Sequence, residues 1–284
     1  MKGIEEHDDY FKQKRNAANV LGQSCLKKVV AAFCIFAYGV PTDALDEYIR
    51  IGESTALEAL RKFVAGVVEI FGSEYTRMPN EQDTTRLLAT GASRGFPGML
   101  GSIDCMHWTL KNYPTAWHGM YKGYKKEPTI ILDAVASKDL WIWHAFFGMP
   151  GSHNDINVFH RSSIFARLAE GKGPQVNYKI NGHDYSMGYY LADGRYPSWA
   201  TFVKTILEPQ GNKKKYFAKA QEACRKDVER SFGVLQSRFA IVRGLARLWD
   251  EDTIHNITTA CIIMHNMIVE DERDEDDYNF NDMG

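Results

Sequence analysis

The sequence predicts an α/β protein in which a mixed β-sheet is flanked by helices and preceded by a small helical region. Up to about residue 71, apolar residues recur at the spacing of amphipathic helices. From Gly98 onward, short β-branched or aromatic runs bounded by turn-forming residues alternate with helical patterns. The strand-like runs come first as a meander and then alternate with helices, which favours one mixed sheet covered by helices.

The N-terminal region predicts three helices. The first, over residues 24–38, is apolar at helical spacing and ends at Gly39, with a proline two residues later. A short helix over residues 43–49 and a longer one over residues 53–71 follow, separated by a turn at Gly52. This order is typical of a helix-turn-helix, but few basic residues lead the longer helix, so an ordinary helical bundle fits equally well.

The sheet region follows a polar connector over residues 72–97, in which residues 80–88 have the pattern of a short capped helix. The predicted strands are residues 99–104, 129–136, 140–147 and 187–193. The predicted helices are residues 156–169, 197–206, 218–238 and 253–271. Residues 171–186, rich in Gly, Lys and Asn, are expected to be an insertion before the fourth strand.

Composition excludes several classes of protein. The 284 residues are 44% hydrophobic and 25% charged, which is globular composition. No apolar run approaches the length of a membrane helix, and five widely spaced cysteines without a CxxC pair disfavour a disulfide scaffold or a structural zinc site. The net charge of −2 conceals an acidic end: residues 270–284 have a balance of −7, which leaves +5 on residues 1–269. We therefore expect a disordered acidic tail over residues 272–284, and a mildly basic body that suits a nucleic-acid partner.

Four carboxylates occupy positions that are typical of a metal site. Asp104 and Asp193 close predicted strands, Asp155 stands at the entrance of a predicted helix, and Glu229 lies inside another. Convergent carboxylates repel one another and are tolerated mainly around a hard cation. Two Mg²⁺ ions about 3.5–4 Å apart would then support phosphodiester cleavage.

Each acid also has a purely structural interpretation. A strand-end Asp such as Asp104 or Asp193 commonly starts a turn, and Asp155 is a good N-cap. Glu229 alternates with charged neighbours, which is typical of a solvated, salt-bridged helix face. Cys105 and His107, beside Asp104, are a weak zinc signal because no second pair accompanies them.

Five blocks of sequence surround these acids and resemble, in order, those of PIF/Harbinger-type transposases and their domesticated nuclease relatives, above all the plant members. The blocks are GSIDCMHW (101–108), GSHNDINV (151–158), YLADGRYP (190–197), KDVERSFGVLQSRF (226–239) and CIIMHNMI (261–268). The resemblance extends from about residue 98 to residue 271, and 35 residues separate Asp193 from Glu229, as in a DD35E-type triad.

The resemblance implies a fold, a reaction and a set of ligands. Residues 98–271 would form an RNase H-like DDE nuclease domain behind an N-terminal, helix-turn-helix-like region over residues 1–92. Asp104, Asp193 and Glu229 would be the catalytic triad that holds two Mg²⁺ or Mn²⁺ ions, with Asp155 as an additional metal ligand. The enzyme would cut phosphodiester bonds of double-stranded DNA, with Lys204 and Lys213–Lys215 as candidate phosphate contacts.

The resemblance also implies a cellular setting. The chain would act in the nucleus with a separate Myb-like DNA-binding protein and without a membrane, and assembly with further copies of itself is left open. Two alternatives stand beside the nuclease: a catalytically silent, domesticated subunit of a chromatin or transcription complex, which the acidic tail favours, and a small-molecule phosphohydrolase. The last ranks lowest because the sequence lacks a phosphate-cradling glycine loop.

Overall fold

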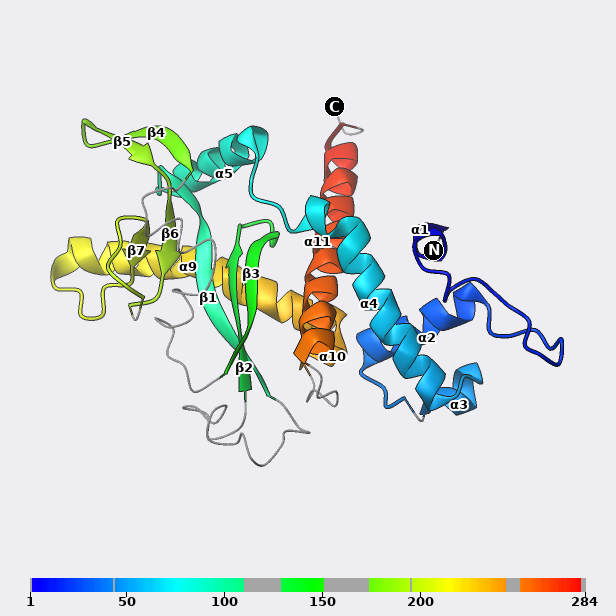
Figure 1. The fold of residues 1–284 in the computed structure, drawn as a ribbon. Coiled ribbons are helices and arrows are strands. Elements are labelled where there is room, and N and C mark those ends of the chain that lie inside the picture. The colour runs from blue at the N-terminus through cyan, green and yellow to red at the C-terminus, as the bar shows by residue number, and fades with distance from the viewer. Residues whose placement is uncertain are drawn as a thin grey trace.

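The computed structural model describes residues 2–42, 44–109, 129–150, 174–194, 196–243 and 251–281. In chain order its elements are α1 (Lys2–His7), α2 (Cys25–Tyr38), α3 (Ala44–Ile49), α4 (Glu53–Tyr75), α5 (Glu81–Ser93), β1 (Met99–Thr109), β2 (Thr129–Ala136), β3 (Ile142–Pro150), β4 (Gln175–Ile180), β5 (His183–Met187), β6 (Tyr189–Ala192), β7 (Phe202–Lys204), α9 (Gly211–Arg238), α10 (Ala240–Arg243) and α11 (Glu251–Asn281) (Figure 1). Asp155 and the helix expected over residues 156–169 lie outside the described residues.

The main sheet has five strands in the order β3-β2-β1-β6-β7. The meander β1-β2-β3 is antiparallel, whereas β6 and β7 run parallel to β1. The prediction of a mixed sheet flanked by helices, preceded by helices, is thus confirmed, and the strand order is compatible with an RNase H-like fold. A short connection over residues 137–141 joins β2 to β3 and allows their antiparallel pairing.

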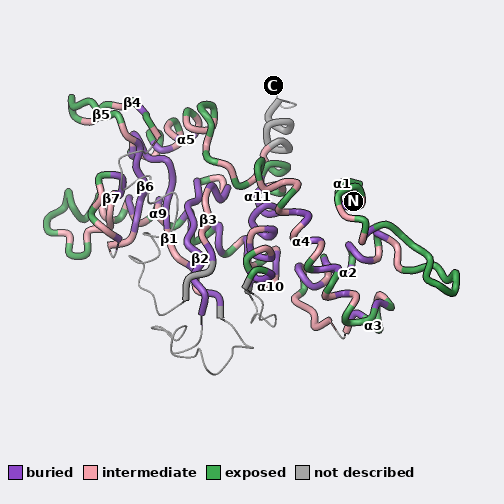
Figure 2. The backbone as a smooth tube through the Cα atoms, viewed as in Figure 1, coloured by how far each residue is buried: buried purple, intermediate pink, exposed green. Residues whose placement is uncertain are grey.

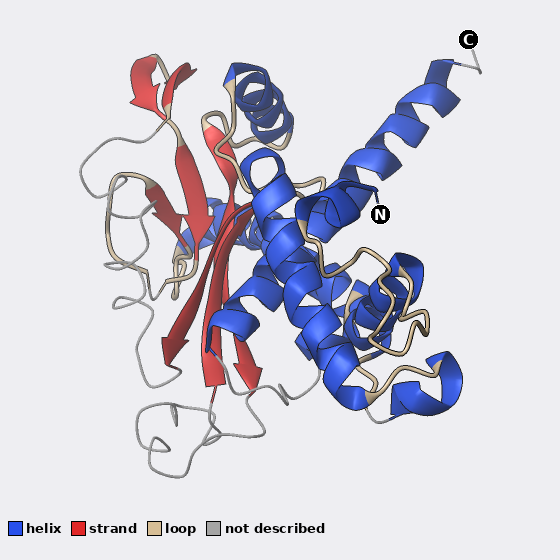
Figure 3. Cartoon of the chain, turned by 45° about the vertical axis from the view of Figure 1, so that its right-hand side comes forward, coloured by secondary structure: helices blue, strands red, loops and turns tan. Residues whose placement is uncertain are grey.

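Helices cover the sheet on both faces and at one edge. Helix α9 packs across β1, β2 and β6 on one face, and α5 packs on β1 from the other. Helix α11 stands beside β3 and packs along α4, which places it between the sheet and the N-terminal helices (Figures 1 and 3).

One apolar core joins the N-terminal helices to the sheet. It runs from Phe36 on α2 and Phe63 on α4, through Ile263 on α11, to Leu132 on β2 and Leu235 on α9 (Figure 2). The helical half therefore has no separate core of its own within the described residues. A boundary between residues 92 and 98 still marks the change from helices to strands.

Several helix ends are set by residues that the sequence singles out. The Ser24 hydroxyl accepts a hydrogen bond from the Lys27 amide at 3.3 Å, and Gly39 ends α2 in the left-handed conformation with φ 59°. Asn80 and Asp83 form a reciprocal capping box at the start of α5. The capped helix expected there is confirmed and extends to Ser93.

Three expectations are corrected. Residues 197–206, expected to be helical, contain strand β7, because Phe202 packs into the core and its neighbours pair with β6. The expected insertion over residues 171–186 contains the hairpin β4-β5, which turns at Asn181 and Gly182 with φ 51° and 86°. The acidic segment from residue 272, expected to be disordered, continues α11 as helix to Asn281.

The acidic helix is held where it leaves the core. Tyr75 donates to the Glu270 carboxylate at 2.8 Å, Arg238 pairs with Glu272, and Arg273 lies 3.6 Å from the Asp139 carboxylate. These contacts give the first acidic residues of the segment fixed partners, so the last described turns of α11 extend an anchored helix.

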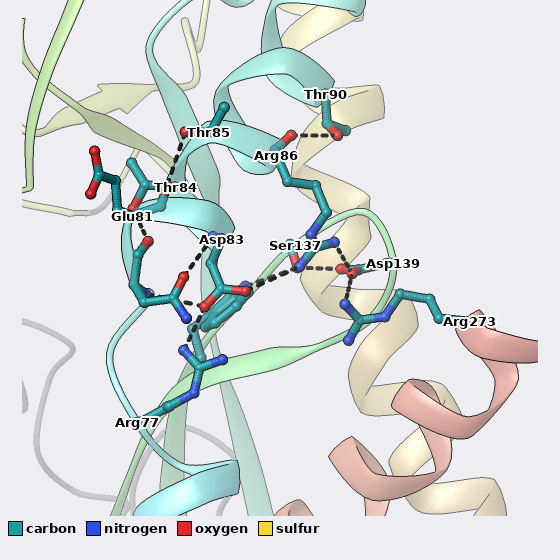
Figure 4. Close-up of polar contacts among 12 residues, drawn as sticks. Arg77, Glu81, Asp83, Thr84, Thr85, Arg86, Thr90, Ser137, Asp139 and Arg273 are labelled. Carbon is teal, nitrogen blue, oxygen red and sulfur yellow. Dashed lines mark hydrogen bonds and ion pairs between the residues drawn. The ribbon is translucent and has the colours of Figure 1, made fainter. Parts of the chain in front are cut away.

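A polar network ties α5, the β2-β3 turn and α11 together (Figure 4). Asp139 in the turn accepts from the Ser137 hydroxyl and pairs with Arg86 of α5 and Arg273 of α11. Burial raises the pKa of Asp139, but the Ser137 hydroxyl and the two guanidinium groups outweigh it and leave the pKa below its ordinary value. The network thus holds Asp139 in its charged form where three elements meet.

Among the described residues, no helix combines the length and the apolar character that crossing a bilayer requires.

Candidate active site

Asp104 lies on the face of β1 that α9 covers. Two residues earlier, the Ser102 hydroxyl donates to the Cys224 carbonyl of α9 at 3.0 Å, and alternate residues of a strand share a face. Arg225 of α9 accordingly reaches Asp104, with Nη1 3.0 Å from Oδ2. The second carboxylate oxygen, Oδ1, accepts from the Cys105 amide at 2.9 Å.

Asp193 directly follows β6, the strand that pairs in parallel with β1. In the parallel pairing of β1 with β6, Ser102 lies opposite Leu191. Asp104 follows Ser102 by two residues on β1, and Asp193 follows Leu191 by two residues, just past the end of β6, so both acids lie toward the same end of this strand pair. The Asp193 carboxylate accepts a hydrogen bond from the Gly194 amide. The pKa of Glu222 on α9 is lowered overall, mainly by its hydrogen bonds with Arg225, and the charge of Asp193 opposes part of that lowering.

Glu229 reaches the same place from α9. It follows Arg225 by one helical turn, and Arg225 Nη2 lies 2.7 Å from Glu229 Oε1. Arg225 also donates to both carboxylate oxygens of Glu222, from Nη2 at 2.8 Å and from Nε at 3.1 Å. One guanidinium therefore contacts three carboxylates: Asp104 from β1, and Glu222 and Glu229 from α9.

The positive charge near Asp104 only partly offsets the cost of burying its ionised carboxylate. Burial raises the pKa of Asp104, and the neighbouring Glu229 carboxylate adds to that effect. The Cys105 amide and the Arg225 guanidinium lower the pKa without cancelling the rise. The pKa of Arg225, whose side chain is 12% exposed, is raised first by its hydrogen bonds with Glu222 and then by the charges of Asp104 and Glu229, against the opposing effect of burial. A further cation at this point would stabilise the ionised carboxylate.

The donor set fits a hard divalent cation. Carboxylate oxygens are the ligands that Mg²⁺ and Mn²⁺ prefer, and the side chains that converge here offer no soft ligand. Within the described part of the chain, no three His, Cys, Asp or Glu side chains stand close enough to hold a metal ion, because the acids converge on Arg225. The ligand set Asp104, Asp193 and Glu229 stays a prediction, and Asp155 lies outside the described residues.

Cys105 and His107 face away from the acids. Alternation along β1 turns both to the opposite side of the sheet from Asp104. There the Cys105 thiol lies 3.5 Å from Asp133 and 3.5 Å from the Tyr196 hydroxyl, and His107 lies 3.2 Å from the Thr129 hydroxyl. These two residues do not join the acidic site.

The lysines singled out by the sequence have different surroundings. Lys204 Nζ donates to the Tyr196 carbonyl at 2.9 Å and to the Ser198 hydroxyl at 3.0 Å, so it holds the loop that follows β6. Lys213, Lys214 and Lys215 are exposed on the first turn of α9. Only the second group is open to a phosphate.

Arg225 and Glu222 are the site residues that sequence reasoning missed. Their spacing from Glu229, four and seven residues, places all three on one side of α9 and is the signal that could have found them. The salt-bridged helix face expected as the structural alternative for Glu229 is present, because Glu229 pairs with Arg225 on α9. The same arginine also pairs with Asp104 of the sheet.

Comparison with known proteins agrees with the sequence blocks. Residues 73–276 match the family described as plant transposon protein. The chain is 22% identical over 259 residues to an Arabidopsis thaliana protein named "Protein ALP1-like", which covers 86% of this chain and 61% of that protein. It is 21% identical over 247 residues to the human "Putative nuclease HARBI1", which covers 86% of this chain and 67% of that protein. The chain thus spans about three fifths to two thirds of the length of these relatives.

No solved structure matches the chain significantly. The family match covers most of the chain and includes the three described acids, the strands that carry two of them and the helix that carries the third. The chain therefore belongs to the plant transposon protein family.

Proposed function

We propose that this protein is a metal-dependent DNA endonuclease of the Harbinger transposase type, with Asp104, Asp193 and Glu229 as its catalytic acids. The observation that carries the proposal is the convergence of Asp104 and Glu229 on one guanidinium, 125 positions apart in the chain. The position of Asp193, directly after the strand that pairs in parallel with β1, supports the proposal. Carboxylates brought together from distant parts of the chain repel one another, and hard cations would stabilise them.

The chemistry follows from the placement of the acids. Asp104, Asp193 and Glu229 would hold the two Mg²⁺ or Mn²⁺ ions. When bound, such a pair polarises the phosphodiester and lowers the pKa of an attacking water. The role of the three carboxylates would be to bind and orient these ions, so the nucleophile would be water or a DNA 3′-hydroxyl and no covalent enzyme intermediate would form.

Helix α9 supplies support for a DNA substrate. It contains eight Lys and Arg residues against three Asp and Glu residues, in a chain whose net charge is −2. Lys215, Lys219 and Lys226 are exposed, and their spacing of four and seven residues places them on one side of the helix, over about 16 Å. Lys226 is within one turn of Glu222 and Glu229, so this row of cations borders the acids and would follow a phosphate backbone to them.

A cleavage assay tests the proposal. Purified protein with Mg²⁺ or Mn²⁺ is expected to nick supercoiled plasmid DNA, and Asp104→Asn or Glu229→Gln should lower the rate at least about 100-fold, as loss of a transition-state-stabilising group does. Asp184→Asn, at an exposed position of β5 in the β4-β5 hairpin, removes one carboxylate elsewhere and should leave nicking unchanged. Equal rates for wild-type and Glu229→Gln protein would refute the proposal.

A catalytically silent subunit of a chromatin or transcription complex is the second candidate. The ion pairs of Arg225 favour it, because they satisfy Asp104 and Glu229 without a metal. An Asp104→Asn, Glu229→Gln double variant that keeps the biological activity of the protein would support this candidate. The nuclear location and the Myb-like partner implied by the resemblance belong to both candidates and distinguish neither.

A further inference from the structure

We infer that Arg225 is a built-in counter-cation of the acidic site, which holds Asp104 and Glu229 in the metal-free protein and passes to Glu222 when a divalent cation binds. The inference rests on the proposed metal site and adds how that site is regulated. A guanidinium and a metal ion would compete for the same carboxylates, and each would bind them when the other is absent. Three features of the site carry it.

The first feature is the position of the guanidinium. Arg225 Nη1 is bonded to Asp104 Oδ2, and Nη2 lies 2.7 Å from Glu229 Oε1. The guanidinium thus bridges the two acids that come from different elements. The other oxygen of Asp104 accepts from the Cys105 amide, so a metal ion that binds Asp104 and Glu229 together competes with Arg225 for the same two carboxylates.

The second feature is that the two cations cannot share the acids without cost. A guanidinium and a divalent ion on the same carboxylate oxygens would stand a few ångströms apart, where like charges repel strongly because the surroundings are partly buried. The Arg225 side chain is 12% exposed and that of Asp104 is 22% exposed, so water screens the repulsion only in part. Metal binding therefore favours withdrawal of Arg225.

The third feature is a partner to which Arg225 can withdraw. Glu222, three residues earlier on α9, accepts from both Nε and Nη2 in a fork-like arrangement. That pairing uses a different carboxylate from the two that the metal needs, and it is already formed. Three carboxylates face one guanidinium, so the site keeps a negative balance that attracts a second cation even while Arg225 is present.

The test is a titration of the full-length protein with MnCl₂, without DNA, followed by isothermal calorimetry. Arg225→Met removes the competing cation and keeps a side chain of similar length, so it should bind Mn²⁺ about 10- to 100-fold more tightly than the wild type. Arg230→Met is the matched control: it removes the same charge one turn further along α9, where the guanidinium pairs with Asp227. It should change the dissociation constant less than about threefold.

The role of Glu222 is tested by a double-mutant cycle. Glu222→Gln should weaken Mn²⁺ binding in the wild-type background, because Arg225 then has only Asp104 and Glu229 as partners. In the Arg225→Met background the same substitution should have a much smaller effect, since no arginine remains to be displaced. Equal effects in both backgrounds would contradict the exchange.

The outcomes separate this inference from the proposed function. If wild-type protein binds Mn²⁺ and Arg225→Met binds it no more tightly, the counter-cation role is wrong and the metal site stands. If neither protein binds Mn²⁺ and Asp104→Asn changes nothing, the metal site itself is wrong, and this inference with it. Circular dichroism checks the fold, and Arg225→Gln, which also removes the charge but keeps a donor, should show the same tightening if Arg225→Met unfolds.

Discussion

At the scale of single residues, His265 and Asn266 show how α11 fixes the edge of the sheet. Asn266 accepts from the Ile142 amide at 2.9 Å and donates to the carbonyls of Ile142 and Tyr75, each at 2.8 Å. His265 Nε2 donates to the Leu140 carbonyl at 2.9 Å. Both side chains are fully buried, and their bonds satisfy backbone groups where β3 begins.

The pH dependence of stability is expected to report on His265. Burial lowers the pKa of His265 to about 4, and its Nδ1 accepts from Arg238 at 3.2 Å, which only the neutral ring can do. Because the unfolded chain protonates near its ordinary pKa of 6.5, stability is full above that value and is lost as the pH falls toward 4, by up to about 3 kcal/mol. Urea unfolding between pH 4 and 8 measures the loss.

Two variants check that His265 causes this loss. His265→Gln keeps a donor and an acceptor but does not titrate, so its free energy of unfolding should vary less with pH between 4 and 6.5. His183→Gln, at the exposed first residue of β5, should keep the wild-type profile. Identical slopes for wild-type and His265→Gln protein would show that another group is responsible.

At the scale of the elements, the two sides of α9 have different roles. Its buried side packs Val228, Phe232 and Leu235 into the core, and Asp227, fully buried, pairs with Arg94 and Arg230. Its other side carries the acids, Arg225 and the exposed lysines. The sequence predicts the helix, while the packing of its apolar side decides which charged residues meet the sheet and which face solvent.

The lysine row of α9 is expected to appear in the salt dependence of DNA binding. Changing Lys215, Lys219 and Lys226 together to Gln should weaken duplex binding and lower the slope of log K against log salt by about 3, one for each lost phosphate contact. Binding is measured in EDTA, so that cleavage does not interfere. A matched triple variant at the exposed Lys2, Lys14 and Lys179 should keep the wild-type slope, and the same reduction in both would contradict a DNA path along α9.

At the scale of the whole molecule, the shared core predicts cooperative unfolding. Every tryptophan of the sequence follows residue 98, so fluorescence reports on the sheet half, whereas far-ultraviolet circular dichroism reports on all helices. Because one apolar cluster joins both halves, the two signals should change at the same urea concentration. Two separate transitions would show that the N-terminal helices form an independent unit.

A single substitution in α2 sharpens this prediction. Phe36, fully buried, packs with ring centroids 6.2 Å from Phe63 of α4 and 6.3 Å from Phe239 at the end of α9. Phe36→Ala should lower the free energy of unfolding by about 3–5 kcal/mol and shift both signals equally, although the change lies in the helical half. The more exposed Phe33→Ala in the same helix should cost much less.

Local signals in the sequence were sufficient for most elements and failed where packing decides. The caps at Ser24 and Asn80 and the strand over residues 129–136 depend on neighbours along the chain, and the structure has them. Strand β7 was missed because its three residues are held by pairing with β6 and by burial of Phe202, which leave no periodic pattern. The Asn181-Gly182 dipeptide is typical of a two-residue hairpin turn, and it could have predicted the β4-β5 hairpin within this polar segment.

The sequence by itself determined the fold class, the family blocks and the identity of three described acids, because helical periodicity, strand patterning and motif spacing are properties of consecutive residues. Only the tertiary structure decided that Asp104 and Glu229 contact one guanidinium, that of Arg225, and that Glu222 pairs with the same group. The reason is physical: which charges neutralise one another depends on distances across β1 and α9, and those distances are set by the packing of the apolar side of α9 on the sheet.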